Sequence, residues 1–71
     1  MRTIEQTDLD QLETLIDSLG LSGVLDALSI ICGEKHDHIL ASYGDKQLAK
    51  GWERASTVID KASAFAGRYA S

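Results

Sequence analysis

The chain has 71 residues, 44% of them hydrophobic, with one cysteine, no proline and a formal net charge of −4. This length allows one domain, and a single thiol excludes an intrachain disulfide. Because non-specific nucleic-acid binding needs a basic surface, the acidic balance predicts no direct nucleic-acid partner.

The first predicted helix covers residues 8–19. Thr7 is placed to cap its N-terminus, and Gly20 is the residue type that commonly ends a helix in a left-handed conformation. Its apolar residues recur at the three-and-four spacing of one helical face: Leu9, Leu12, Ile16 and Leu19. The sequence therefore predicts a short amphipathic helix.

The second and third predicted helices cover residues 23–42 and 46–67. Ser22 and Asp45 are their candidate N-caps, and Tyr43-Gly44 interrupts the apolar pattern between them. The apolar face of the second helix is Val24, Leu28, Ile31 and Ile39, with Leu25 and Cys32 beside it. The stripe of the third is Leu48, Trp52, Ala55, Ile59, Ala62 and Ala66. A break this short between two long helices predicts an antiparallel hairpin.

The predicted fold is all-α: one domain, residues 1–71, with a short N-terminal helix and a long antiparallel hairpin. A domain of this size buries only about 60% of its unfolded surface, so small chains often need a partner chain. A lone hairpin would leave one apolar side exposed to water, namely Leu28, Ile31, Ile59 and Phe65. We therefore expect a homodimer with a four-helix-bundle-like core, the first helix lying across the bundle or capping one end.

Membrane and export signals are not recognised in the sequence. No apolar run reaches the roughly 18–20 residues that cross a bilayer, and residues 1–6 lack the apolar stretch of a signal peptide. A lone thiol without an export signal indicates a cytoplasmic protein. The expectation is a cytoplasmic chain with no membrane partner.

Lys35 falls on the predicted apolar face, between Ile31 and Ile39. Its methylenes can pack while the ammonium reaches water, or it can pair with Glu53 or Asp17. A third reading is functional: a pocket for a small anionic ligand lined by Lys35, His38 and Trp52. All three readings remain open at this point, although Trp52 is more simply a core anchor.

Cys32 and His36 are four residues apart and share one side of a helix, a spacing that can hold a metal ion. Structural zinc takes four ligands, so a site would need a two-fold axis beside this pair, and His38 points elsewhere. Metal binding is kept as an alternative function, and no cofactor is predicted. The acid–base residues of 34–38 fan out around the helix axis without a nucleophile, so no enzyme is predicted.

The third helix is basic in an otherwise acidic chain. Residues 46–71 carry a net charge of +3, whereas residues 1–26 carry −5. Four of its cations recur along the predicted outward side: Lys50, Arg54, Lys61 and Arg68. This stripe is either a solvated face or a docking surface for an acidic partner, supplied by the protein's own first helix or by a foreign protein.

One further indication is a resemblance. Three segments carry it: Gly20-Leu21 with Val24-Leu25-x-Ala27-Leu28, Ile31-Cys32-x-Glu34-Lys35-x-x-His38-Ile39, and Leu48-Ala49-x-x-Trp52-Glu53-Arg54-Ala55. Over residues 9–63 the chain resembles a recurrent group of short helical proteins of bacteria and bacteriophages with no established activity. The resemblance implies a bacterial or phage setting. By analogy with small acidic phage proteins, the hypothesis is a non-enzymatic protein-interaction module, an inhibitor or adaptor that binds a host protein.

Overall fold

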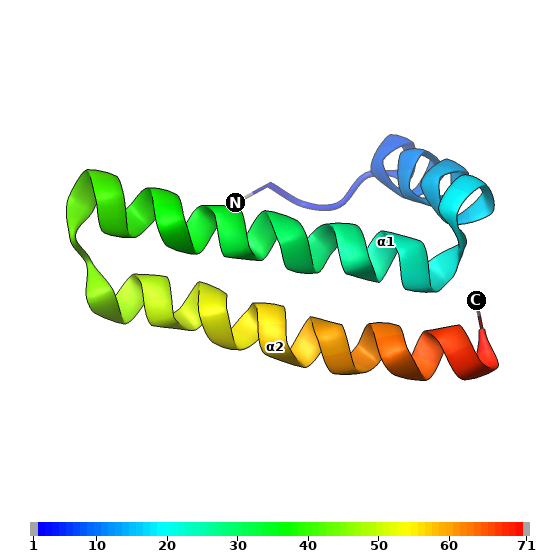
Figure 1. Ribbon diagram of the computed structural model, residues 1–71. Helices are drawn as coiled ribbons and strands as arrows, with labels where there is room; N and C mark the ends of the chain where they lie inside the picture. The colour runs from blue at the N-terminus through cyan, green and yellow to red at the C-terminus, as the bar shows by residue number, and fades with distance from the viewer. Residues whose placement is uncertain (1, 71) are drawn as a thin grey trace.

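The computed structural model describes residues 2–70 and consists of two helices, α1 (Gln6–Tyr43) and α2 (Lys46–Tyr69). They pack side by side along most of α2 (Figure 1). No strand occurs within the described range. The predicted all-α class and the antiparallel pair are therefore confirmed.

α1 begins earlier than predicted, with Glu5 as its N-cap residue. The Asp8 carboxylate accepts a hydrogen bond of 2.9 Å from the backbone N–H of Glu5. The same carboxylate accepts two hydrogen bonds from the Arg2 guanidinium, at 2.5 and 2.6 Å. Thr7 therefore lies inside the first turn, and the prediction that it caps the helix is wrong. An acidic side chain in the first turn also interacts favourably with the positive end of the helix dipole.

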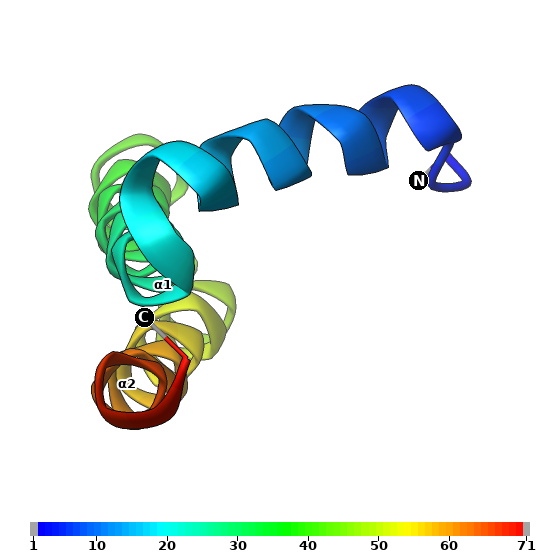
Figure 2. The same cartoon turned by 90° about the vertical axis from the view of Figure 1, so that its right-hand side faces the viewer.

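Gly20 breaks α1 into two segments, as its backbone angles (φ 77°, ψ 161°) are not helical. The helix resumes at once with Leu21, so Ser22 is not an N-cap as predicted. We call residues 6–19 the arm, and residues 21–43 together with α2 the hairpin. Figure 2 shows the arm projecting to one side of the hairpin. The arm therefore does not lie along the hairpin helices.

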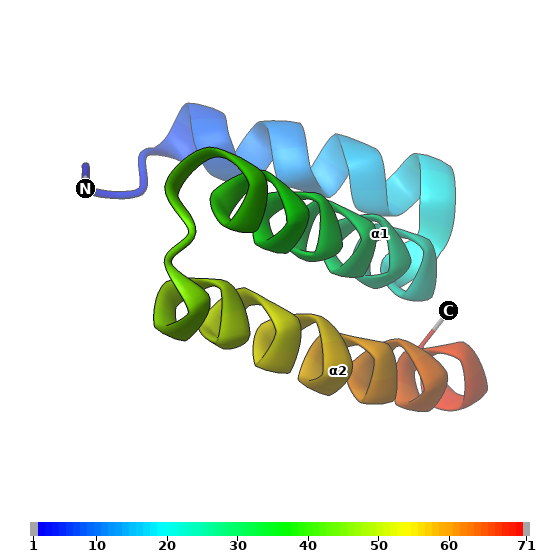
Figure 3. The same cartoon turned by 60° about the vertical axis from the view of Figure 1, so that its left-hand side comes forward.

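The turn between α1 and α2 agrees with the prediction. Gly44 is left-handed (φ 64°), and its N–H donates to the carbonyl oxygens of Ile39 and Leu40 at 3.0 and 3.2 Å. The Asp45 carboxylate accepts from the backbone N–H of Leu48 at 3.0 Å. Together these bonds end one helix and start the next within two residues, and α2 runs back beside α1 (Figure 3).

Most of the buried side chains in the seam between the hairpin helices are small. The buried residues of the hairpin are Val24, Ser29, Cys32 and Ile39 on α1, and Ala49, Ser63 and Ala66 on α2. Half-buried residues continue the same three-and-four spacing: Leu25, His36, Trp52, Ser56 and Ile59. Small residues at such positions let two helix backbones approach closely.

The predicted apolar stripes are buried only in part. Val24, Cys32, Ile39 and Ala66 are buried and Trp52, Ala55 and Ile59 are half-buried, whereas Leu48 is 53% exposed and Ala62 is also exposed. Leu28 and Ile31 are 39% and 46% exposed, as expected for a hairpin without a partner. Serines, which the apolar pattern did not include, also occupy the seam, where their hydroxyls are satisfied by the facing helix. The Ser63 hydroxyl, for example, donates to the Ser22 carbonyl at 3.0 Å and also contacts the Asp26 carboxylate.

Candidate interaction surface

The four cations predicted as a partner-binding stripe are all exposed on α2: Lys50, Arg54, Lys61 and Arg68. We call them the basic ridge. Within residues 2–70 none of the four forms an ion pair. The Arg68 guanidinium lies 5.8 Å from the centroid of the Tyr69 ring, which is an interaction within one turn of the same helix. The ridge is therefore a set of uncompensated positive charges facing solvent.

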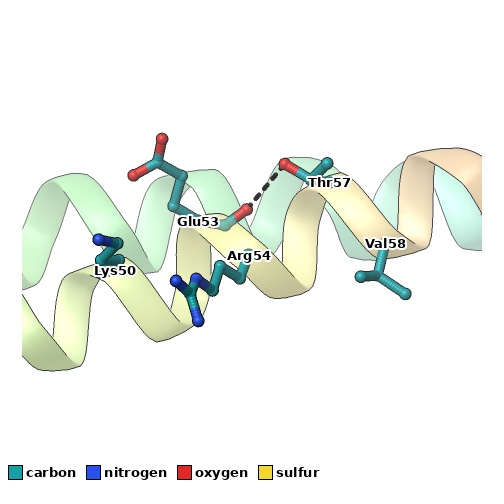
Figure 4. Close-up of a pocket in the computed structure, with 5 residues that line it drawn as sticks. All are labelled: Lys50, Glu53, Arg54, Thr57 and Val58. Carbon is teal, nitrogen blue, oxygen red and sulfur yellow. Dashed lines mark hydrogen bonds between the residues drawn. The ribbon is translucent and has the colours of Figure 1, made fainter.

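Glu53, which directly precedes Arg54 in sequence, is turned towards α1. Its carboxylate oxygen lies 3.8 Å from the Nε2 atom of His36. Figure 4 shows the carboxylate directed away from the guanidinium of Arg54. The Thr57 hydroxyl donates to the Glu53 carbonyl at 3.2 Å, a bond that stays within α2. The carboxylate that precedes Arg54 in sequence therefore does not pair with this guanidinium.

A shallow depression lies on the outer surface of α2, beside the ridge. Its lining residues are Lys50, Glu53, Arg54, Thr57 and Val58. Two ridge cations and an apolar side chain thus border one hollow (Figure 4). Val58 is 64% exposed, and the sequence reading did not single it out. Helical spacing could have identified Val58 from the sequence, because it lies seven residues before Phe65 and therefore on the same side of the helix.

An apolar face extends over one side of the hairpin. We define it by Leu28 and Ile31 on α1 and by Val58 and Phe65 on α2, which are between 39% and 64% exposed. Helical spacing places all four on the same side of the seam. Leu28, Ile31 and Phe65 were predicted to be exposed in a lone hairpin, and they are. Ile59, the fourth predicted residue, is half-buried because it lies in the seam.

The candidate ligand residues Lys35, His38 and Trp52 are not brought together as a single set. Lys35 and His38 line a shallow depression with Ile31 and Glu34, and Trp52 is not part of its lining. Trp52 is half-buried and lies on the seam side of α2, so it is a partly buried core residue. The alternative of an ion pair between Lys35 and Glu53 or Asp17 is not seen within residues 2–70. Lys35 is exposed, so its ammonium reaches water directly.

The metal alternative rested on Cys32 and His36. Cys32 is buried in the seam as a free thiol. The Nδ1 atom of His36 lies 3.0 Å from the Asp37 carboxylate, and its Nε2 atom faces Glu53. Over the described residues, no group of three or more histidine, cysteine or carboxylate side chains is arranged to hold a metal ion. Two potential ligands from one chain do not make a structural site, which normally has four.

The composition of α1 bears on the membrane question. By length and composition, α1 is apolar enough to cross a bilayer, with a mean hydropathy of 1.7 over its best 18-residue window, of which 17% is buried. Every such window with at most two charged residues includes Gly20. Because Gly20 is not helical, this stretch does not form one straight helix in the structure. Core helices of soluble proteins and signal sequences can have the same length and apolar composition as a membrane-spanning helix.

Comparisons with protein-family models, curated proteins and solved structures found no match for this chain.

Proposed function

We propose that the protein is a non-enzymatic protein-interaction module, acting as a cytoplasmic homodimer that binds an acidic surface of a cognate protein through the basic ridge. In a bacterial or phage setting such a module would serve as an inhibitor or adaptor of a host protein. One observation carries the proposal: the ridge presents four exposed cations without an ion pair in the described chain. The small-ligand alternative is less supported, because Trp52 lies apart from the depression at Lys35 and His38.

The electrostatics of the ridge support this role. Lys50 and Arg54 are four residues apart on a helix, where like charges destabilise by a few tenths of a kcal/mol. No acidic side chain of the described residues offsets this repulsion by pairing with the ridge. An acidic partner surface would relieve it and would also accelerate encounter through electrostatic steering.

The test is charge reversal of the ridge, Lys50→Glu with Arg54→Glu. The matched control is Lys35→Glu with Lys46→Glu, which changes the net charge equally at two exposed cations outside the ridge. A partner is first isolated from bacterial lysate with the wild-type protein and purified, and its affinity for each variant is then measured at several salt concentrations. Both variants should fold, because exposed substitutions usually change stability by less than about 0.5 kcal/mol.

The ridge variant should lose the partner, whereas the control should retain it. Wild-type affinity should fall as salt rises, because exposed charges are screened beyond about 8 Å at physiological ionic strength. Unchanged affinity of the folded ridge variant would show that the ridge is only a solvated face.

A further inference from the structure

The chain exposes far more surface than its mass requires. Its accessible surface is 5584 Å², whereas a compact monomer of 7.7 kDa exposes about 4,300 Å². Stable protein interfaces bury roughly 800 Å² on each partner, and obligate dimers bury more. The excess of about 1,300 Å² is therefore the size of one substantial interface per chain.

The arm exposes a series of large apolar side chains. Its five large apolar side chains are between 37% and 55% exposed: Leu9, Leu12, Leu15, Ile16 and Leu19. At about 100° per residue they form one continuous strip. Asp10, Glu13 and Asp17 follow along one edge of that strip, and the arm has no basic residue. The arm is thus an amphipathic helix with an acidic flank and no cover on its apolar side.

The hairpin presents the complementary arrangement. On α2, Val58 and Phe65 of the apolar face adjoin Arg54 and Lys61 of the basic ridge at helical spacing. The depression shared by Lys50, Arg54 and Val58 shows this neighbourhood directly (Figure 4). An apolar strip with a basic flank therefore matches, in both apolarity and charge, the apolar strip with an acidic flank on the arm.

We propose that two copies of this chain exchange arms, each arm covering the apolar face of the other copy's hairpin with its acidic flank beside the basic ridge. This inference rests on the homodimer of the proposed function and names the contact that forms it. To cover the apolar face of its own hairpin, the arm would have to lie against that hairpin. The non-helical backbone of Gly20 instead directs the arm away from that hairpin (Figure 2). The excess of about 1,300 Å² per chain is more than the roughly 800 Å² that each partner of a stable interface buries.

Sedimentation equilibrium of full-length variants tests the exchange. The wild-type protein should have twice the 7.7 kDa chain mass at micromolar concentration. Leu12→Asp with Ile16→Asp should be monomeric, and so should Val58→Asp with Phe65→Asp on the receiving face. Gln11→Asp with Thr14→Asp adds the same charge on the polar side of the arm and should remain dimeric. If Leu12→Asp with Ile16→Asp is still a dimer, the arm does not form the contact and arm exchange is wrong.

A second measurement separates exchange from an arm that folds back within its own chain. A nitroxide is attached to the cysteine of a Gln11→Cys, Cys32→Ser variant prepared at natural isotope abundance. This spin-labelled protein is mixed with ¹⁵N-labelled Cys32→Ser protein that carries no nitroxide. Exchange predicts broadening of the Val58 and Phe65 amide signals in the copy without the nitroxide. Absence of this broadening in a mixed dimer overturns the proposal.

Charge reversal on the arm separates this inference from the proposed function. Asp10→Lys with Asp17→Lys should weaken the dimer several-fold but should leave the ridge able to bind a purified acidic partner. Retention of the full wild-type dimer affinity would contradict the acidic-flank contact without affecting the proposed partner site.

Discussion

Ser29 of α1 and Ser56 of α2 exchange hydrogen bonds across the middle of the hairpin. Each hydroxyl oxygen lies 3.2 Å from the backbone carbonyl oxygen of the other residue, and the two hydroxyl oxygens are 2.9 Å apart. The two hydroxyl protons suffice for the two carbonyls, so every polar group of the pair has a partner. This pair fixes the register of two helices that otherwise share a narrow apolar seam.

The serine pair predicts that volume is more critical than polarity at this position. Ser56→Ala removes a hydrogen-bonding hydroxyl and should cost about 1 kcal/mol of unfolding free energy. Ser56→Leu forces a larger side chain between the helices and should cost more, roughly 1–3 kcal/mol. Urea denaturation followed by circular dichroism measures both. Ser42→Leu, at an exposed position, is the control and should be nearly neutral. A stabilised Ser56→Leu variant would show that the helices are not held close here.

Two glycines provide a matched test of the turn. A Cβ added at Gly44 or at Gly51 would meet no atom within 4 Å, so only backbone conformation distinguishes them. Gly44 is left-handed, and Gly44→Ala should destabilise by about 1–2 kcal/mol. Gly51 lies inside α2, and Gly51→Ala should stabilise by roughly 0.5–1 kcal/mol. Thermal unfolding should therefore shift in opposite directions, and shifts of the same sign would contradict the assigned turn.

Trp52 should contribute less to stability than a fully buried tryptophan. Because it is half-buried, Trp52→Ala should cost roughly 2–3 kcal/mol, below the about 3–5 kcal/mol of fully buried aromatic truncations. Tyr43→Ala, at a residue 75% exposed, should change stability by less than about 0.5 kcal/mol. Chemical denaturation of the two variants makes the comparison. If the Trp52→Ala variant unfolds at the same denaturant concentration as the wild type and the Tyr43→Ala control, Trp52 does not stabilise the seam.

The start of α1 should depend on pH through Asp8. The hydrogen bond from Arg2, followed by the one from the Glu5 backbone, holds the pKa of Asp8 below its ordinary value of 3.8. The stabilisation is therefore complete above that ordinary value and is lost as pH falls through the lowered pKa of the folded protein.

NMR titration of the Asp8 carboxyl measures this shift. Arg2→Ala should move the pKa of Asp8 upwards towards 3.8, because it removes the largest cause of the lowering. Arg68→Ala, at the far end of the chain, should leave it unchanged. An Asp8 that titrates at its ordinary pKa in the wild-type protein would contradict the Arg2 contact.

Local chemistry in the sequence was enough to predict several features. Gly44 and Asp45 give the turn because a left-handed glycine and a carboxylate cap act within a few residues. Gly20 interrupts the first apolar pattern for the same reason. The exposure of Leu28, Ile31 and Phe65 could be predicted because a chain of 71 residues has too few residues to cover both sides of the hairpin. The outward position of the basic ridge followed from helical spacing alone.

The tertiary structure decided which side of each helix faces the other. Apolar periodicity favoured Leu48 for the seam, because large apolar side chains usually gain most from burial. Close approach of the two backbones instead places Ser29 and Ser56 there, and the gain comes from hydrogen bonds that exist only when both helices are present. The direction of the arm was likewise not encoded in periodicity. It depends on the two backbone angles of Gly20, a residue type that can adopt many conformations and whose choice is made by the chain around it.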